Sequence, residues 1–84
     1  MKLQIRYFAA IREALGPGET LEVADGATVA SVRDALIARG GAHAAMLARG
    51  KALRMAFDKV LCDEKTALPA AGGELAFFPP VTGG

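Results

Sequence analysis

Hydrophobic and polar positions alternate in two stretches of the N-terminal part of the chain. In the first stretch, Leu3, Ile5 and Tyr7 take every second position. The second stretch, residues 19–23 with the sequence ETLEV, has the same period. A period of two is typical of a strand with one buried face, so both stretches are predicted to be strands.

Shorter stretches raise the question of additional helices. Residues 9–15 place Ile11 and Leu15 four positions apart, which favours a short helix. The Gly-Pro-Gly of residues 16–18 would end it. Residues 42–52, with the sequence AHAAMLARGKA, permit either a second short helix or an alanine-rich loop. Their periodicity does not decide between the two.

The clearest helical pattern lies in the middle of the chain. Thr28 is a good N-cap, and Gly40 and Gly41 stand where a helix commonly ends. The apolar residues follow the spacing i, i+3, i+7 and i+8, and Arg33 falls off this stripe. The stripe consists of Val29, Val32, Leu36 and Ile37. We expect this main helix to cross the sheet.

The C-terminal half predicts shorter strands. Residues 53–57 and 59–62 are strand candidates that only Asp58 separates. Residues 74–78, with the sequence ELAFF, form a last strand after a glycine-containing turn. The prolines at residues 79–80 cannot donate hydrogen bonds to a sheet, so this strand is predicted to end before them.

The order of these elements predicts a two-layer α+β domain. A right-handed crossover would place the first and last strands side by side in the middle of a mixed sheet. This arrangement is a β-grasp, with one main helix packed across the sheet and short extra helices. We assign residues 1–78 to the β-grasp domain and residues 79–84 to an extended, flexible C-terminal tail.

The size and charge of the chain limit the functions that it could have. The 84 residues suffice for one small domain, and a hydrophobic content of 52% supports a core. The formal net charge of +1 arises without charged runs, which indicates neither nucleic acid nor an anionic membrane as a partner. No apolar stretch resembles a signal peptide or spans a bilayer, and the single cysteine fits a reducing compartment. We therefore expect a soluble, cytoplasmic protein.

Side chains that could support catalysis are scarce. His43 is the only histidine and has no acid or nucleophile beside it in the sequence, so we expect a surface or partly packed side chain. Cys62 ends an apolar strand candidate, where a free cysteine usually behaves as a small buried hydrophobe. One histidine and one cysteine do not make a metal site. No glycine-rich stretch has the lysine and the serine or threonine of a phosphate loop.

The last residues, FFPPVTGG, are the remaining candidate for chemistry. Pro79 and Pro80 favour an extended exit from the sheet, so that residues 81–84 would reach roughly 13 Å beyond the domain. Without Cβ atoms, Gly83 and Gly84 could enter a narrow channel in another protein. The only functional group there is the carboxylate of Gly84, which ATP could convert to an acyl-adenylate and a sulfur nucleophile then to a thiocarboxylate. The alternative is a frayed end without a role.

The chain resembles the small, sulfur-carrying subunits of molybdopterin synthase in FFPPVTGG, in RYFAAIREALG (residues 6–16) near the start and in its length. The resemblance implies a ubiquitin-like β-grasp and no bound cofactor. It implies that a ubiquitin-activating-type enzyme uses ATP to adenylate Gly84, and that a desulfurase or rhodanese system supplies the sulfur. Pro80, Val81, Thr82 and Gly83 would enter the active sites of partner enzymes. The large catalytic subunit would then use the sulfur to convert cyclic pyranopterin monophosphate to molybdopterin within a heterotetramer.

The resemblance also implies an apolar contact with the large subunit. Phe77 and Phe78 are consecutive, so their side chains point to opposite faces of the last strand. We assign Phe8 and Phe78 to the partner interface, together with Leu61. The alternative is that Phe8 and Phe78 both belong to the core.

Other functions fit the same features. The chain could carry sulfur for thiamine synthesis or tRNA thiolation, or become attached to other proteins through Gly84 as a modifier. It could also be a ubiquitin-like interaction module without chemistry, or a thiol enzyme that uses Cys62.

Overall fold

The computed structural model describes residues 1–80. Within this range the chain forms five strands and three helices, and none of these helices is long and apolar enough to span a membrane. In chain order the elements are β1 (Lys2–Tyr7), α1 (Ala9–Leu15), β2 (Gly18–Glu22), α2 (Val29–Ile37), α3 (Gly41–Leu47), β3 (Arg54–Phe57), β4 (Val60–Cys62) and β5 (Gly73–Phe78). All predicted strands are therefore present, with their ends shifted by at most one residue.

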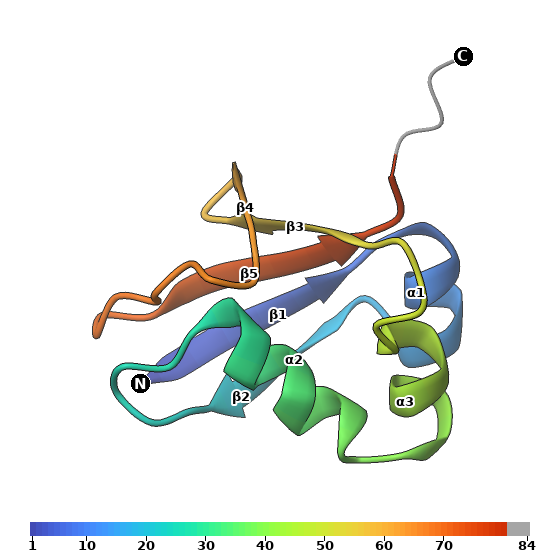
Figure 1. Cartoon of the computed structure of the whole chain (residues 1–84), viewed down its shortest axis with the longest axis horizontal. Helices are drawn as coiled ribbons and strands as arrows, with labels where there is room; N and C mark the ends of the chain where they lie inside the picture. The colour runs from blue at the N-terminus through green and yellow to red at the C-terminus, as the bar shows by residue number, and fades with distance from the viewer. Residues whose placement is uncertain (81–84) are drawn as a thin grey trace.

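The strands form one mixed sheet in the order β2-β1-β5-β3-β4. β1 and β5 pair in parallel, from Leu3 opposite Gly73 to Tyr7 opposite Phe77, whereas the other pairs are antiparallel. Figure 1 shows β1 and β5 running side by side through the middle of the sheet. The predicted ubiquitin-like β-grasp is confirmed.

The core lies between the sheet and the helices on one of its faces. Leu3, Ile5 and Tyr7 are buried at every second position of β1, as their alternation predicts. Leu75 and Phe77 of β5 are buried on the same side. In Figure 1, α2 and α3 lie together on this side of the sheet.

The main helix α2 begins as its sequence indicates. The hydroxyl of Thr28 accepts a hydrogen bond from the backbone N–H of Ser31, and the Ser31 hydroxyl accepts one from the N–H of Thr28. This capping box pairs backbone groups that would otherwise lack partners at the start of the helix. The stripe residues Val29, Val32 and Leu36 are buried.

Arg33 is buried although it falls off the apolar stripe of α2. Only 4% of the residue is exposed. Its guanidinium donates hydrogen bonds to the carbonyls of Leu47 and Ala48, at 2.7 and 2.9 Å. These carbonyls lie at the C-terminal end of α3, where they have no partners within the helix. Arg33 therefore fastens α3 to the main helix.

The predicted end of the main helix is wrong in detail. α2 ends at Ile37, with Ala38 as its C-cap, so Gly40 and Gly41 do not cap it. Gly40 is instead the N-cap of α3, and Gly41 is its first residue. Both glycines have positive φ, 73° and 52°, which L-residues with a Cβ adopt at a cost. They reverse the chain between two consecutive helices.

A two-residue turn joins β3 to β4. Asp58 and Lys59 both have positive φ, as a tight hairpin turn requires. The Asp58 carboxylate accepts a hydrogen bond of 2.9 Å from the N–H of Glu74, and the Asp58 N–H donates one of 2.8 Å to the Glu74 carbonyl. The turn is thereby fixed beside the start of β5.

Candidate functional site

The predicted sulfur-carrying tail follows β5 directly. Pro79 and Pro80 stand outside any strand and are half-buried. Val81, Thr82, Gly83 and Gly84 lie outside the described residues, and their roles stay predictions. What the structure describes is the sheet from which this segment leaves.

The three residues assigned to the partner interface share one face of the sheet. Ala76 of β5 lies opposite Ala56 of β3, and Ala56 lies opposite Leu61 of β4. Because side chains at paired positions point the same way, these residues share a face. Phe78 follows Ala76 by two residues, and Phe8 lines the same groove as Phe78. We call this surface, opposite the helices, the open face.

The side chains of the two consecutive phenylalanines of β5 point to opposite faces of the sheet, as predicted. Phe77 is fully buried in the core, where it stacks against Tyr7 with ring centroids 6.3 Å apart. Phe78 is only half-buried, and Phe8 is 38% exposed. Leu61 is 69% exposed on the edge strand β4. The alternative that Phe8 and Phe78 both belong to the core is therefore wrong.

A groove of about 640 Å³ crosses the open face. Small side chains, Ala56 and Ala76, lie at its centre, and larger ones, Phe8, Phe78 and Pro79, line it as well. A hollow lined by aromatic residues is suited to receive an apolar side chain of a partner. The two alanines were not among the site residues predicted from the sequence. The sequence contains a signal for Ala76, because this residue lies two positions before Phe78 and therefore on the same face of β5.

A polar cluster lies on the opposite, helical side of the sheet. The Tyr7 hydroxyl donates a hydrogen bond of 2.7 Å to the Glu19 carboxylate. Nε2 of His43 lies 2.9 Å from the same carboxylate oxygen, Oε2, and Arg39 is ion-paired with the other oxygen, Oε1. The ring of Tyr7 meets that of His43 edge to face, with centroids 6.4 Å apart. This cluster joins β1, β2, α3 and the short segment between α2 and α3.

The cluster shifts the pKa values of two of its members. Partial burial raises the pKa of Glu19, but hydrogen bonds from His43, Tyr7 and Arg39 outweigh it and lower the pKa to about 2. Burial, followed by the hydrogen bond to Glu19, raises the pKa of Tyr7 well above its usual value. Both shifts keep the carboxylate ionised and the phenol protonated at neutral pH. The cluster is thus suited to hold the fold together rather than to transfer protons.

Replacing Glu19 with glutamine is expected to lower the free energy of unfolding at pH 7 by about 1–3 kcal/mol, because charge-assisted hydrogen bonds are lost. The folded-state pKa of Glu19 lies below its unfolded value of about 4.3. Its stabilising effect is therefore complete above that value and declines as the pH falls toward about 2. Urea unfolding at a series of pH values measures both effects. Glu13→Gln, at an exposed position of α1, is the matched control. Equal unfolding midpoints for the two variants would contradict the prediction.

The two side chains considered for catalysis are not arranged for it. Burial, followed by the nearby carboxylate of Asp63, raises the pKa of the Cys62 thiol, which keeps it in its unreactive protonated form. His43 is engaged with the carboxylate of Glu19. Among residues 1–80, no group of histidine, cysteine and acidic side chains could hold a metal ion. The open face and the segment that leaves it are the remaining candidate site.

Comparison with known proteins identifies a family and full-length relatives of the chain. Residues 5–84 match the model of the ThiS family. The chain is 39% identical over 82 residues to a protein of Haemophilus influenzae named molybdopterin synthase sulfur carrier subunit, covering 98% of this chain and 99% of that protein. A protein of Escherichia coli with the same name is 36% identical over 88 residues, with the same coverage of 98% and 99%.

Solved structures resemble the chain over its length. The crystal structure of SAMP1 from Haloferax volcanii superposes with a TM-score of 0.77 at 30% sequence identity, covering 100% of both chains. The five-stranded sheet and its helices are thus those of a known type of domain.

Proposed function

The chain belongs to the ThiS family, and on this premise we propose that it is the sulfur-carrier subunit of a molybdopterin synthase. The observation that carries the proposal is the match of nearly the whole chain to two bacterial proteins of that name, at 36% and 39% identity. The family match extends to residue 84 and so includes the C-terminal segment on which a carrier of this kind depends. The single cysteine supports a cytoplasmic location.

The chemistry that we propose takes place on Gly84. An activating enzyme transfers AMP from ATP to the carboxylate and releases pyrophosphate, which leaves an acyl-adenylate. The outer sulfur of a persulfide on a desulfurase or rhodanese then displaces AMP to give an acyl disulfide, and a thiol reduces this disulfide to release the thiocarboxylate. In the large subunit, the thiocarboxylate donates its sulfur to cyclic pyranopterin monophosphate, and water hydrolyses the bond between this sulfur and the acyl group, so that Gly84 returns to a carboxylate. No side chain of the carrier takes part in these steps, in keeping with the protonated thiol of Cys62.

The remaining residues of the carrier serve to present this group. We propose that Pro79 and Pro80 direct the tail, residues 81–84, away from the sheet and into the partner active sites. Phe8, Phe78 and Leu61 would contact the large subunit, because they are the exposed apolar side chains of the open face from which the segment leaves. Two carriers and two large subunits would form the heterotetramer.

Mass spectrometry of the protein isolated from its native host tests the proposal. We expect a fraction of the chains to carry one sulfur in place of one oxygen at Gly84, and this fraction to disappear when the activating enzyme is deleted. A second candidate function, a protein modifier, comes from the similarity to SAMP1, a small archaeal modifier protein. It predicts instead an isopeptide bond between Gly84 and lysines of other proteins. Unmodified Gly84 in every chain would contradict both.

A further inference from the structure

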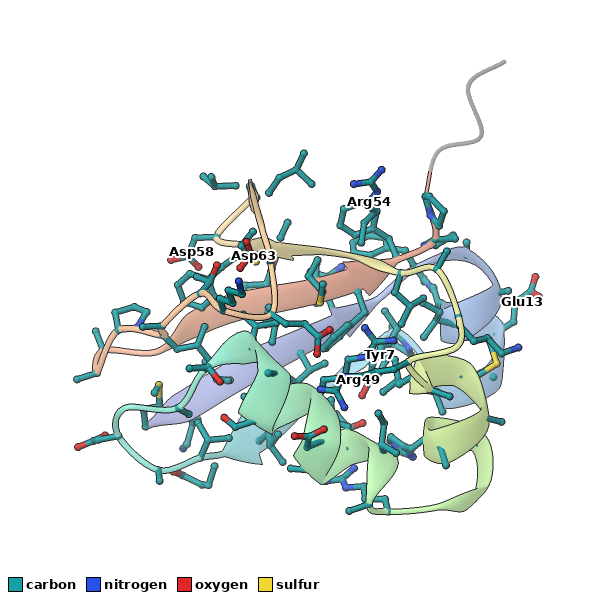
Figure 2. All side chains as sticks on the ribbon, in the orientation of Figure 1. Tyr7, Glu13, Arg49, Arg54, Asp58 and Asp63 are labelled. Atoms are coloured by element: carbon teal, nitrogen blue, oxygen red, sulfur yellow. The ribbon has the colours of Figure 1, made fainter. Side chains whose placement is uncertain are left out.

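The groove on the open face has positively charged side chains around its apolar centre. Arg6 and Lys59 line the groove, and Arg54 lies opposite Phe78 in the pairing of β3 with β5. Figure 2 shows Arg54 projecting from the sheet on the side away from the helices. Two carboxylates, those of Asp58 and Glu74, lie near the Lys59 end.

Most of these charges are engaged within the protein. The Arg6 guanidinium lies 3.4 Å from the Glu74 carboxylate and covers the ring of Phe8, with its central carbon 5.7 Å from the ring centroid. The Asp58 carboxylate accepts the hydrogen bond from the Glu74 N–H. Both carboxylates and Arg6 are thereby held in place by contacts inside the domain.

Arg54 and Lys59 are the exceptions. Both residues are exposed, and neither takes part in an ion pair among residues 1–80. Arg54 lies next to one end of the groove, because it pairs with Phe78, and Lys59 lines the other end, in the turn that follows β3. Three cations, Arg6, Arg54 and Lys59, and two carboxylates surround the groove, and Arg54 and Lys59 are the cations there that remain available to a partner.

We propose that the groove binds an apolar side chain of the large subunit that is flanked by carboxylates, one facing Arg54 and one facing Lys59. The inference rests on the proposed function for the identity of the partner. The apolar side chain would lie over Ala56 and Ala76, beside the rings of Phe8 and Phe78. Charges at the rim of an apolar contact steer association and select among partners more than they raise the final affinity. Arg54 and Lys59 are thus specificity-determining residues of this carrier.

Carbodiimide cross-linking tests the contact at Lys59 directly. This reagent joins an amine to a carboxylate in contact with it through an amide bond, and the carbodiimide takes up the water that is lost and leaves as a urea. In the complex of the full chain with its large subunit, we expect an amide bond between Lys59 and an aspartate or glutamate of the large subunit. Lys51 and Lys65, exposed lysines that do not line the groove, should stay unlinked. Lys59→Arg keeps the charge and should keep binding while it loses the cross-link. A complex in which Lys59 remains unlinked would overturn the proposal.

Charge reversal tests both cations together. We expect the double variant R54E/K59E to associate with the large subunit at least about tenfold more slowly at low salt. The difference should shrink at about 0.5 M salt, because screening shortens the range of exposed charges. The double variant K51E/K65E makes the same change in net charge away from the groove and should differ from the wild type by less than about twofold. Equal association rates for the two double variants at low salt would overturn the proposal.

The experiments distinguish a wrong charged contact from a wrong proposed function. If wild-type carrier binds the large subunit but R54E/K59E binds equally well, only the charged contact is wrong. If the wild-type carrier does not bind the large subunit at any salt concentration, the proposed function is wrong, and the charged contact with it.

Discussion

Removal of Gly83 and Gly84 is expected to abolish ATP-dependent thiocarboxylation and sulfur transfer completely, while the melting temperature hardly changes. Without these residues, no carboxylate reaches the position at which the activating enzyme forms the acyl-adenylate. The buried residues of the core lie between Leu3 and Phe77, so the fold should tolerate the deletion. The measurement is the conversion of the pterin precursor by the large subunit, with each carrier variant first exposed to the activating enzyme and ATP.

Two companion variants show whether position or mere presence of the carboxylate matters. An added residue after Gly84 keeps a carboxylate but displaces it by about 3.5 Å, and it should be as damaging as the deletion. Gly84→Val keeps the carboxylate in place but adds a branched Cβ, and it should transfer sulfur slowly rather than not at all. If the C-terminal segment has no role, all three variants work normally. Product formation at the wild-type rate by the deletion variant would exclude a carrier of this kind.

The parts of the fold that depend on a local pattern could be predicted from the sequence. Alternation places Leu3, Ile5 and Tyr7 in the core, and the same rule separates Phe77 from Phe78. The main helix has both an apolar stripe and a side-chain cap at Thr28, and each is a local signal. These features need no knowledge of the rest of the chain, because the period of a strand or helix decides which side chains share a face.

Features that depend on contacts between distant residues could not be predicted in this way. Glu19 and His43 are 24 residues apart, so nothing near His43 in the sequence indicates its carboxylate partner. Arg33 is buried because the end of α3 presents two carbonyls to it, which the pattern of α2 does not record. The helix α3 itself has no side-chain cap, and Leu47 is its only buried residue, so its stripe is too weak to recognise.

The same distinction applies to the candidate site. The exposure of Phe8 and Phe78 follows from alternation along single strands. The groove that they line does not, because it requires Ala56 and Ala76 to meet across β3 and β5. The placement of Arg54 beside Phe78 likewise comes only from the pairing of β3 with β5. The exposure of single residues can be predicted from the sequence, whereas the shape and charge of the surface depend on how the strands pair.

The open face gives the second large effect that we expect. Phe78→Arg should weaken the complex with the large subunit by at least about 30-fold, because a central aromatic residue of an interface commonly contributes 2 kcal/mol or more. The guanidinium would also have to leave water at the centre of an apolar contact. The fold should survive, since Phe78 is half-buried and its neighbour Phe77 remains in the core. Gel filtration detects the loss of the complex, and thermal melting reports on the fold.

Two further variants separate this effect from charge and from damage to the sheet. Thr20→Arg adds the same charge to an exposed position of β2, and it should bind normally, because β1 separates β2 from β5. Phe78→Ala removes the ring without adding charge, and it should weaken binding by roughly the same factor as Phe78→Arg if the lost apolar contact is the cause. Normal binding by Phe78→Ala with loss of binding by Phe78→Arg would instead place Phe78 at the rim of the interface. Unfolding of both variants would mean that the ring supports the sheet, and the partner contact would then have to lie elsewhere on the open face.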